Sequence, residues 1–258
     1  MRRFGGLAAC SLLVILGLVF SSSPAPAMTS NLLSEHFTRA NGLITNGWAH
    51  WNPTNTLAVI DKTWDLTSGS LFARSGRGWT GVADTNATGA TSTTGTGSAI
   101  FRMTSRRVDF GNVRVSAIVK LDSYTSTTRT PAVDWDGVHI WLRHHDETEL
   151  YAMSVARRDG SVVIKKKCAG GTTNGGTYYT LASASAHPMA FAKLTAVAAS
   201  AVNLADGGVR LRLEQAGRTL LDVVDHGTGC AAIRTGGAIG VRGDNATFWL
   251  DDLLVDRA

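Results

Sequence analysis

Residues 134–167 read DWDGVHIWLRHHDETELYAMSVARRDGSVVIKKK, and this stretch decides the fold. It predicts three strands joined by two tight polar turns, at residues 145–147 and 158–160. The first strand alternates apolar and functional side chains with a period of two: Val138, Ile140 and Leu142 against His139, Trp141 and Arg143. Such a ribbon has one buried face and one face that carries rings and charges.

The next two strands extend this ribbon. In the second, Leu150, Ala152 and Ser154 alternate with Tyr151, Met153 and Val155; the third ends in Lys165, Lys166 and Lys167. We therefore predict half of a β-sandwich that presents a binding surface. The side chains expected on its outward face are His139, Trp141, Arg143, Tyr151, Lys165 and Lys167, with Arg210 and Arg212 added from a later strand.

The rest of the chain predicts further short strands at a spacing of roughly ten residues, separated by Gly-rich turns. They are expected at 99–103, 112–121, 191–199, 209–213, 220–224, 238–241 and 248–255, with a strand, a turn and a strand over 64–73. No helix longer than two turns is expected, and the Ala-rich region 182–201 is where a helix is the alternative. With no linker or repeat, residues 28–258 are predicted to form a single all-β domain, a jelly-roll sandwich.

The first 27 residues have the pattern of a signal peptide. Arg2 and Arg3 precede an apolar run over residues 11–20, and Ala25-Pro26-Ala27 is a small-x-small cleavage site. We expect a secreted, extracellular protein with no stable membrane anchor after cleavage; an uncleaved anchor is the alternative. The formal net charge of the 258 residues is +5, and removing the two leader arginines leaves +3, which does not call for a nucleic-acid partner.

The mature chain keeps two cysteines, Cys168 and Cys230, both in Gly-rich surroundings. In an oxidising compartment they predict a disulfide, which would contribute about 4 kcal/mol on the chain-entropy model. Two free thiols or a metal pair are the alternatives. Residues 75–98 predict a long Gly/Thr/Ser loop that contains Trp79, which either stacks on a sugar or anchors the loop to the core.

Together these features resemble the concanavalin A-like lectin/glucanase superfamily, close to laminin-G-like modules of secreted proteins. The resemblance covers nearly the whole mature chain. It rests on EHF at 35–37 with Trp48 and Trp51, TSGSL at 67–71, DGVH at 136–139 running to Tyr151 and RDG at 158–160, GVRGDN at 240–245, and FWLDDLLV at 248–255. It implies a two-sheet antiparallel jelly-roll sandwich that is concanavalin A-like.

Members of this superfamily often hold a structural calcium ion. The positions that match here are Glu35, the carbonyl of Gly69, and Asp251, and oxygen ligands from distant strands would suit calcium. The alternative is that Asp251 lies solvated at a sheet edge.

The glucanases of the superfamily carry a Glu-x-Asp-x-x-Glu run on one strand, and this chain has none. A β-eliminating lyase acting on uronic-acid glycans is a further possibility, with His139, Tyr151 and Arg143 as the catalytic candidates. The motifs of alginate lyases are not present in order, since Val138 precedes His139 and no Gln stands two residues ahead of it. A glycoside hydrolase is the weaker form of the enzyme hypothesis.

The function expected first is binding of a polysaccharide on the concave face of the sandwich by a monomer. Trp141, Tyr151 and Trp79 would stack on sugar rings, and the basic residues Lys165, Lys167, Arg210 and Arg212 favour an acidic glycan. The alternative is that Trp141 and His139 are covered and belong to a second small core.

Overall fold

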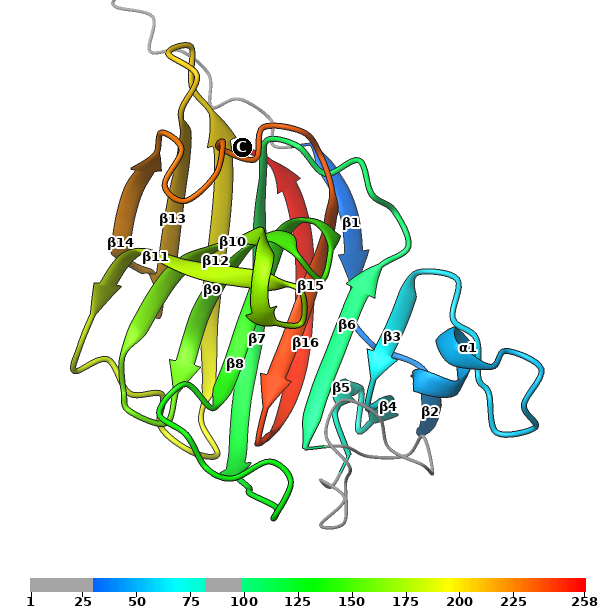
Figure 1. The fold of residues 1–258 in the computed structure, drawn as a ribbon. Helices are drawn as coiled ribbons and strands as arrows, with labels where there is room; N and C mark the ends of the chain where they lie inside the picture. Colours follow the sequence, from blue (N-terminus) through cyan, green and yellow to red (C-terminus); the bar gives the residue numbers. More distant parts are fainter. Residues whose placement is uncertain (1–29, 82–98) are drawn as a thin grey trace, which may run out of the picture.

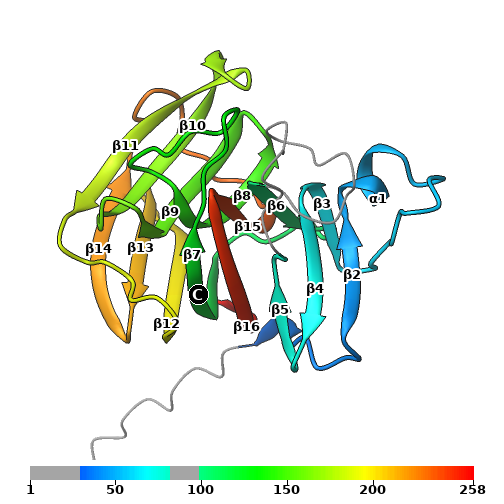
Figure 2. The ribbon, with the colours of Figure 1, turned by 90° about the horizontal axis from the view of Figure 1, so that it is seen from below.

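The structure of the protein is a computed structural model that describes residues 30–81 and 99–258. Over these residues two antiparallel β-sheets pack face to face (Figures 1 and 2). The predicted all-β, two-sheet sandwich is therefore confirmed. The predicted signal peptide and residues 82–98 of the predicted loop lie outside the described residues.

The larger sheet has nine strands among the described residues, in the order β14-β13-β12-β7-β16-β5-β4-β2, with β1 also paired to β16. These strands are β1 (Asn31–Glu35), β2 (Gly42–Asn46), β4 (Ser70–Arg74), β5 (Arg77–Trp79), β7 (Val113–Tyr124), β12 (Leu194–Asn203), β13 (Val209–Gln215), β14 (Arg218–Asp225) and β16 (Ala246–Arg257).

The smaller sheet has seven strands within the same residues, in the order β11-β10-β9-β8-β15-β6-β3. These are β3 (Trp64–Ser68), β6 (Ile100–Ser105), β8 (Gly137–Asp146), β9 (Glu149–Arg157), β10 (Val162–Thr173), β11 (Gly176–Ala184) and β15 (Ala238–Asp244). The predicted three-strand meander forms β8, β9 and β10, in the middle of this sheet.

The core lies between the two sheets and follows the predicted alternation. From the seven-stranded sheet, Val138, Ile140 and Leu142 of β8 are buried in it, and from the other sheet the alternate residues 113–121 of β7. Because side chains on a strand point to opposite faces in turn, His139 and Trp141 are left on the outer face of the seven-stranded sheet.

The predicted strand, turn and strand over residues 64–73 form β3 and β4, but the two strands enter different sheets. Gly69 lies between them with φ of 82°. A Cβ atom at Gly69 would lie 3.1 Å from a ring carbon of Phe101 and 3.3 Å from its Cα. Glycine therefore allows both the left-handed backbone and the close approach at this crossing.

Four strands were not predicted: β1, β2, β5 and β11. Trp79 ends β5, so the segment around it is a strand and the loop prediction is wrong there. The Ala-rich region contains the end of β11 and most of β12, so the strand prediction is confirmed. One short helix, α1 (Gly47–Trp51), occurs among residues 30–81 and 99–258, and no helix in these ranges is long and apolar enough to cross a membrane.

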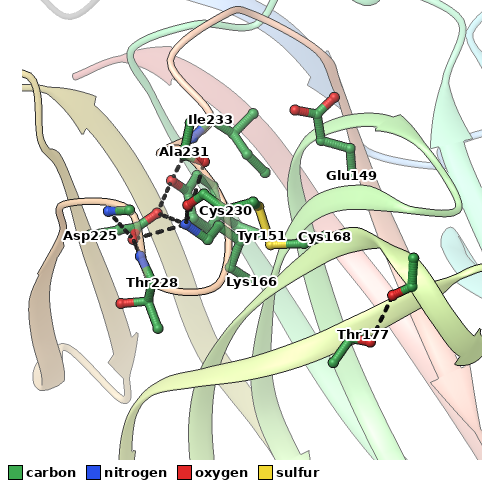
Figure 3. The surroundings of a disulfide bond; sticks show 12 residues. Glu149, Tyr151, Lys166, Cys168, Thr177, Asp225, Thr228, Cys230, Ala231 and Ile233 are labelled. Atoms are coloured by element: carbon green, nitrogen blue, oxygen red, sulfur yellow. Dashed lines mark hydrogen bonds and ion pairs between the residues drawn. A yellow bond between two sulfur atoms is a disulfide. The ribbon is translucent and has the colours of Figure 1, made fainter.

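The predicted disulfide is confirmed. Cys168 at the middle of β10 bonds to Cys230 in the loop after β14, with an S–S distance of 2.05 Å (Figure 3). Beside it the fully buried Lys166 ammonium lies 2.8 Å from Asp225 Oδ2 and also donates to the carbonyl of Cys230 at 2.6 Å. The ion pair attaches the end of β14 to the seven-stranded sheet, and the disulfide attaches the loop that follows.

Candidate functional site on the outer face of the seven-stranded sheet

The strand registers arrange functional side chains in two neighbouring rows on this outer face. One row runs from Arg102 on β6 through Arg242 on β15 and His139 on β8 to Ser154 on β9. The next row contains Thr104, Gly240, Trp141, Ala152 and Lys165 on the same strands and β10. The rows cross the strands, so residues far apart in sequence form a continuous surface.

Two hollows lie over these rows. The first hollow has a volume of about 230 Å³ and the second about 540 Å³. The first is lined by Trp135, His139, Trp141, Ala152, Ser154, Arg157, Lys165, Thr173, Tyr178, Arg242 and Asp244. The second is lined by His50, Trp51, Asp65, Thr67, Arg102, Thr104, Ser105, Arg106, Val108, His144, His145, Asp146, Glu147, Asn174 and Ala238.

A chain of polar side chains forms the floor of the first hollow. The Oγ of Ser154 lies 2.9 Å from Nδ1 of His139, and Nε2 of His139 lies 3.3 Å from Oδ2 of Asp244. Burial lowers the pKa of His139, so its ring is neutral at pH 7. The carboxylate of Asp244 is bound by Arg242 at 2.7 Å. Burial alone would raise the pKa of Asp244, but the charges and hydrogen bonds of Arg242 and His139 together outweigh it and lower that pKa, so Asp244 stays ionised.

The cations of the first hollow are not all neutralised. Arg157 is paired with Asp159 at 2.6 Å, and Arg242 with Asp244. Lys165 has no carboxylate within ion-pair distance among the described residues, and its ammonium lies 5.9 Å from the centre of the Tyr178 ring. Burial, and then the charge of Arg157, lower the pKa of Lys165. An anionic group of a ligand beside Lys165 would stabilise the charged form of this lysine.

Several buried nitrogens of this face lack a hydrogen-bond partner within the described part of the chain. They are Nε of Arg102, Nε1 of Trp141 and Nε2 of His144. The arginine and tryptophan nitrogens can only donate, so they can be satisfied only by an acceptor. A buried polar group without a partner costs about 1–3 kcal/mol, and a ligand oxygen could recover part of that cost.

The aromatic side chains of this face differ in exposure. The ring of Trp141 stacks on His144 with centroids 4.9 Å apart, and Trp141 is only 1% exposed. It forms a small second cluster with Leu150 and Ala152, against which Tyr178 packs. The prediction that Trp141 offers an open stacking surface is therefore wrong, and the alternative of a second small core describes it better; His139 is also buried. The open rings are Trp51 and Trp135, which are 60% and 52% exposed.

Arg143 does not lie on the outer face, contrary to prediction. The pairing of β8 with β9 shifts register after Leu142, and Arg143 has a left-handed φ of 49°. This bulge turns Arg143 inward, where its guanidinium donates to the carbonyl of Ile233 and, at 2.7 Å, to Oδ1 of Asn203. His144 takes the outer position that simple alternation assigns to Arg143.

Tyr151 was also predicted to face outward, and it lies in the core between the sheets. Its hydroxyl donates to Asp225 at 2.7 Å and accepts from the backbone N–H of Ile233 at 3.0 Å (Figure 3). Burial, reinforced by Asp225, raises the pKa of this hydroxyl. A glycan on the outer face cannot reach it, so neither stacking nor catalysis by Tyr151 fits this position.

Lys167 lies on the predicted face, but it is 1% exposed. Its ammonium donates to the carbonyl of Glu147 and lies 5.1 Å from the centre of the Tyr178 ring. Lys167 is therefore buried beneath the outer face and cannot contact a ligand there. Lys165 is the lysine that lines the first hollow.

Three predicted ligand-binding residues lie on the opposite sheet. Trp79 packs on Trp249 with centroids 5.7 Å apart. Arg210 and Arg212 both bind Asp222, at 2.6 and 2.9 Å. Trp79 belongs to β5 and the two arginines to β13, both in the nine-stranded sheet. The prediction that Arg210 and Arg212 share a face with His139 is therefore wrong.

The three predicted calcium ligands are already committed to other partners. The Glu35 carboxylate accepts from Arg39 at 2.7 Å, and Asp251 accepts from Arg77 at 3.0 Å. The carbonyl of Gly69 accepts from the N–H of Gly47 at 3.0 Å. Residues 30–81 and 99–258 contain no group of three or more His, Cys, Asp or Glu placed to hold a metal ion. As arranged, these ligands do not fit a calcium ion.

Sequence reasoning missed much of the site. The residues not assigned to the surface are Trp135, Tyr178, Arg242 and Asp244. Their signal was weak, because β11 was not predicted and β15 joins the meander only through a long-range pairing. The Arg-Gly-Asp spacing at 242–244 places both charged side chains on one face of a strand, and it could have suggested the pair.

Comparisons with known proteins were made by sequence and by structure. No family model and no curated protein matches the sequence. Among solved structures, the chain is similar to the carbohydrate binding module CBM66 from Bacillus subtilis, with a TM-score of 0.51 and 11% identity over 75% of this chain and 94% of that one.

Two further solved structures have similar scores. One comes from work on endo-acting O-glycanases that initiate mucin breakdown in the human gut microbiota, with a TM-score of 0.53 and 10% identity over 89% of this chain and 100% of that chain. The other is the catalytic domain of an endo-1,3-beta-glucanase (laminarinase) from Thermotoga petrophila RKU-1, with a TM-score of 0.50 and 10% identity over 88% of this chain and 97% of that chain. At such identities the likeness concerns the fold, and the chain has the concanavalin A-like jelly-roll fold.

Proposed function

We propose that the outer face of the seven-stranded sheet binds a polysaccharide. The observation that carries this proposal is the group of buried nitrogens without partners among the described residues beneath the two hollows, on Arg102, Trp141 and His144. A sugar supplies many hydroxyl oxygens that can accept from such donors. Trp51 and Trp135 supply open rings beside them, which suits the apolar faces of sugars.

The preferred glycan is acidic. Lys165 is a half-buried cation in the first hollow, and no carboxylate of the described residues pairs with it. A uronate carboxylate placed there would form a charge-assisted hydrogen bond. The similar Bacillus subtilis module is named as a carbohydrate binding module, which supports carbohydrate binding as such and says nothing of the charge of the glycan.

We also propose that the protein is secreted and acts as a monomer without a membrane anchor. The leader pattern of residues 1–27 supports export. The Cys168–Cys230 disulfide agrees with an oxidising compartment. Size-exclusion chromatography with light scattering of the exported protein, together with its amino-terminal sequence, tests both points.

Affinity electrophoresis of residues 28–258 in gels that contain neutral or uronic-acid polysaccharides tests the binding. We expect retardation in at least one uronic-acid gel, reduced in Lys165→Gln and in Trp135→Ala. Arg210→Gln is the matched control, because it removes a cation from the opposite sheet. Equal mobility of the wild type in all gels, or equal retardation of Lys165→Gln and the wild type, would contradict the proposal.

A second candidate function is β-elimination in the first hollow. The reaction removes the C5 proton of a uronate and breaks the C4–O bond, so a C4=C5 double bond forms and the leaving oxygen takes up a proton. His139 is neutral and can accept a proton, and burial raises the pKa of Tyr178, which keeps its hydroxyl protonated as a donor. Arg242 lies near both and carries positive charge for the uronate.

The test of this second candidate is the absorbance of unsaturated sugar ends. If the chain is a lyase, product accumulates with a uronic-acid polymer, and it is lost in His139→Ala and strongly reduced in Tyr178→Phe. Tyr151→Phe is the informative comparison, because its hydroxyl lies in the core. Binding without product assigns the surface to recognition alone.

A further inference from the structure

The two hollows lie next to each other on the outer face of the sheet. Trp141 lines the first hollow and stacks on His144, which lines the second. Between Trp141 and Thr104 the register places Gly240, which has no side chain. A Cβ atom there would lie 3.2 Å from Cε3 of Trp141. The missing side chain leaves room for the indole and keeps the surface low where the two hollows adjoin.

Together the two hollows are longer than one sugar ring. From β3 to β10 they cross five spacings between neighbouring strands, about 24 Å in total. At the β3 end, the indole N–H of Trp51 donates to the carbonyl of Thr67 at 2.8 Å, which holds the exposed ring in place. At the other end lie Trp135 and Lys165. Open aromatic rings at both ends suit a ligand that reaches both.

The two hollows differ in charge. In the second hollow several ionisable groups are paired, and it is also lined by Asp146 and Glu147. His50 lies 2.6 Å from Asp65, and Arg106 lies 3.0 Å from the other oxygen of that carboxylate. His145 is paired with Glu149 at 2.8 Å. In the first hollow Lys165 has no such partner within the described residues. An anionic group of the ligand is therefore favoured at one end only, and ring stacking at the other.

We propose that this trough binds an internal run of several sugars of a linear acidic glycan, laid across the strands. A carboxylate of the glycan lies at Lys165, and a sugar ring further along the chain stacks on Trp51. This inference rests on the proposed function and adds the length and the orientation of the ligand. It predicts that affinity grows with chain length until the ligand reaches from the first hollow to Trp51.

The test is isothermal titration calorimetry of the mature protein with alginate oligosaccharides and oligogalacturonates, from the disaccharide to the octasaccharide. We expect the octasaccharide of the recognised polymer to bind at least about tenfold more tightly than its disaccharide. Trp51→Ala should remove about fivefold to tenfold of the octasaccharide affinity and leave the disaccharide affinity unchanged. Lys165→Gln should weaken binding at every length.

Phe191→Ala is the matched control, because Phe191 is an exposed aromatic residue that lines neither hollow. Disaccharide and octasaccharide that bind equally well would overturn this inference and leave the proposed function standing. The same holds if Trp51→Ala binds the octasaccharide like the wild type. Failure of every oligosaccharide and of both parent polymers to bind would overturn the proposed function as well.

Discussion

At the scale of single residues, buried ionisable groups distinguish the two sides of the seven-stranded sheet. On the inner side Lys166 and Asp225 form a fully buried pair, to which Tyr151 adds a hydrogen bond. On the outer side Trp141 and His144 retain nitrogens without a partner among the described residues. The inner groups are satisfied and serve stability, whereas the outer ones belong to the surface that we propose binds a ligand.

Replacing Lys166 by Met should destabilise the protein by about 3–5 kcal/mol, because it leaves the charge of Asp225 buried without its partner. The double variant Lys166→Met/Asp225→Leu should lose much less than the sum of the two single changes. Urea unfolding of the four proteins measures this coupling. Strict additivity would show that the pair contributes no interaction energy.

The burial of His139 predicts how the free energy of unfolding depends on pH. Burial lowers its folded pKa below the unfolded value of about 6.5, so the unfolded chain binds more protons in the window below pH 6.5. Stability conferred by keeping this ring neutral is complete above that value and falls as the pH drops through the window. The unfolding free energy, measured in urea at pH 7 and pH 5, should decrease more for the wild type than for His139→Gln.

At the scale of elements, the sequence predicted what depends on alternation and failed where alternation is broken. The core positions of β8 were correct as far as Leu142, because a strand buried on one face requires apolar residues at every second position. Arg143 was misplaced since a bulge leaves no mark on a period-two pattern. Tyr151 was misplaced because a buried hydroxyl needs a distant partner, Asp225, that no local pattern reveals.

The contribution of the inward-facing Arg143 to stability can be tested by substitution. Arg143→Met should cost about 2–3 kcal/mol, because the carbonyl of Ile233 and the amide oxygen of Asn203 lose a charged donor. The measurement is the midpoint of urea unfolding, compared with Arg212→Met on the solvent face of β13. A similar small change in both variants would mean that the buried guanidinium adds nothing to stability.

The disulfide also acts between elements, because it connects β10 with the loop after β14. The two half-cystines are 62 residues apart, and on the chain-entropy model the bond contributes about 4 kcal/mol. The variant Cys168→Ser/Cys230→Ser should unfold at correspondingly lower urea concentration. Unchanged unfolding after reduction with dithiothreitol would contradict this expectation.

At the scale of the whole molecule, the fold was predictable from the sequence and the site was predictable only in part. Regularly spaced strands and Gly-rich turns are typical of a sandwich or barrel. They do not say which strands share a sheet, so Arg210 and Arg212 were assigned to the wrong one. His139 and Lys165 were placed on the correct face because both lie within the continuous meander β8–β10.

Whether the protein binds calcium can be tested on the whole molecule. Because Glu35 and Asp251 are held by arginines, we expect chelation with EDTA to leave the melting temperature unchanged. Differential scanning calorimetry with and without added calcium measures this. A rise in melting temperature with calcium would show that the ion displaces Arg39 or Arg77.

The pairing of Arg210 and Arg212 with Asp222 has a consequence for behaviour at surfaces. Cations that are already neutralised attract an anionic matrix weakly, and such attraction is further reduced by salt. Adhesion should therefore be one-sided. On an insoluble acidic gel or cell wall the molecule would settle with β8, β9 and β10 against the matrix and β12, β13 and β14 towards the medium.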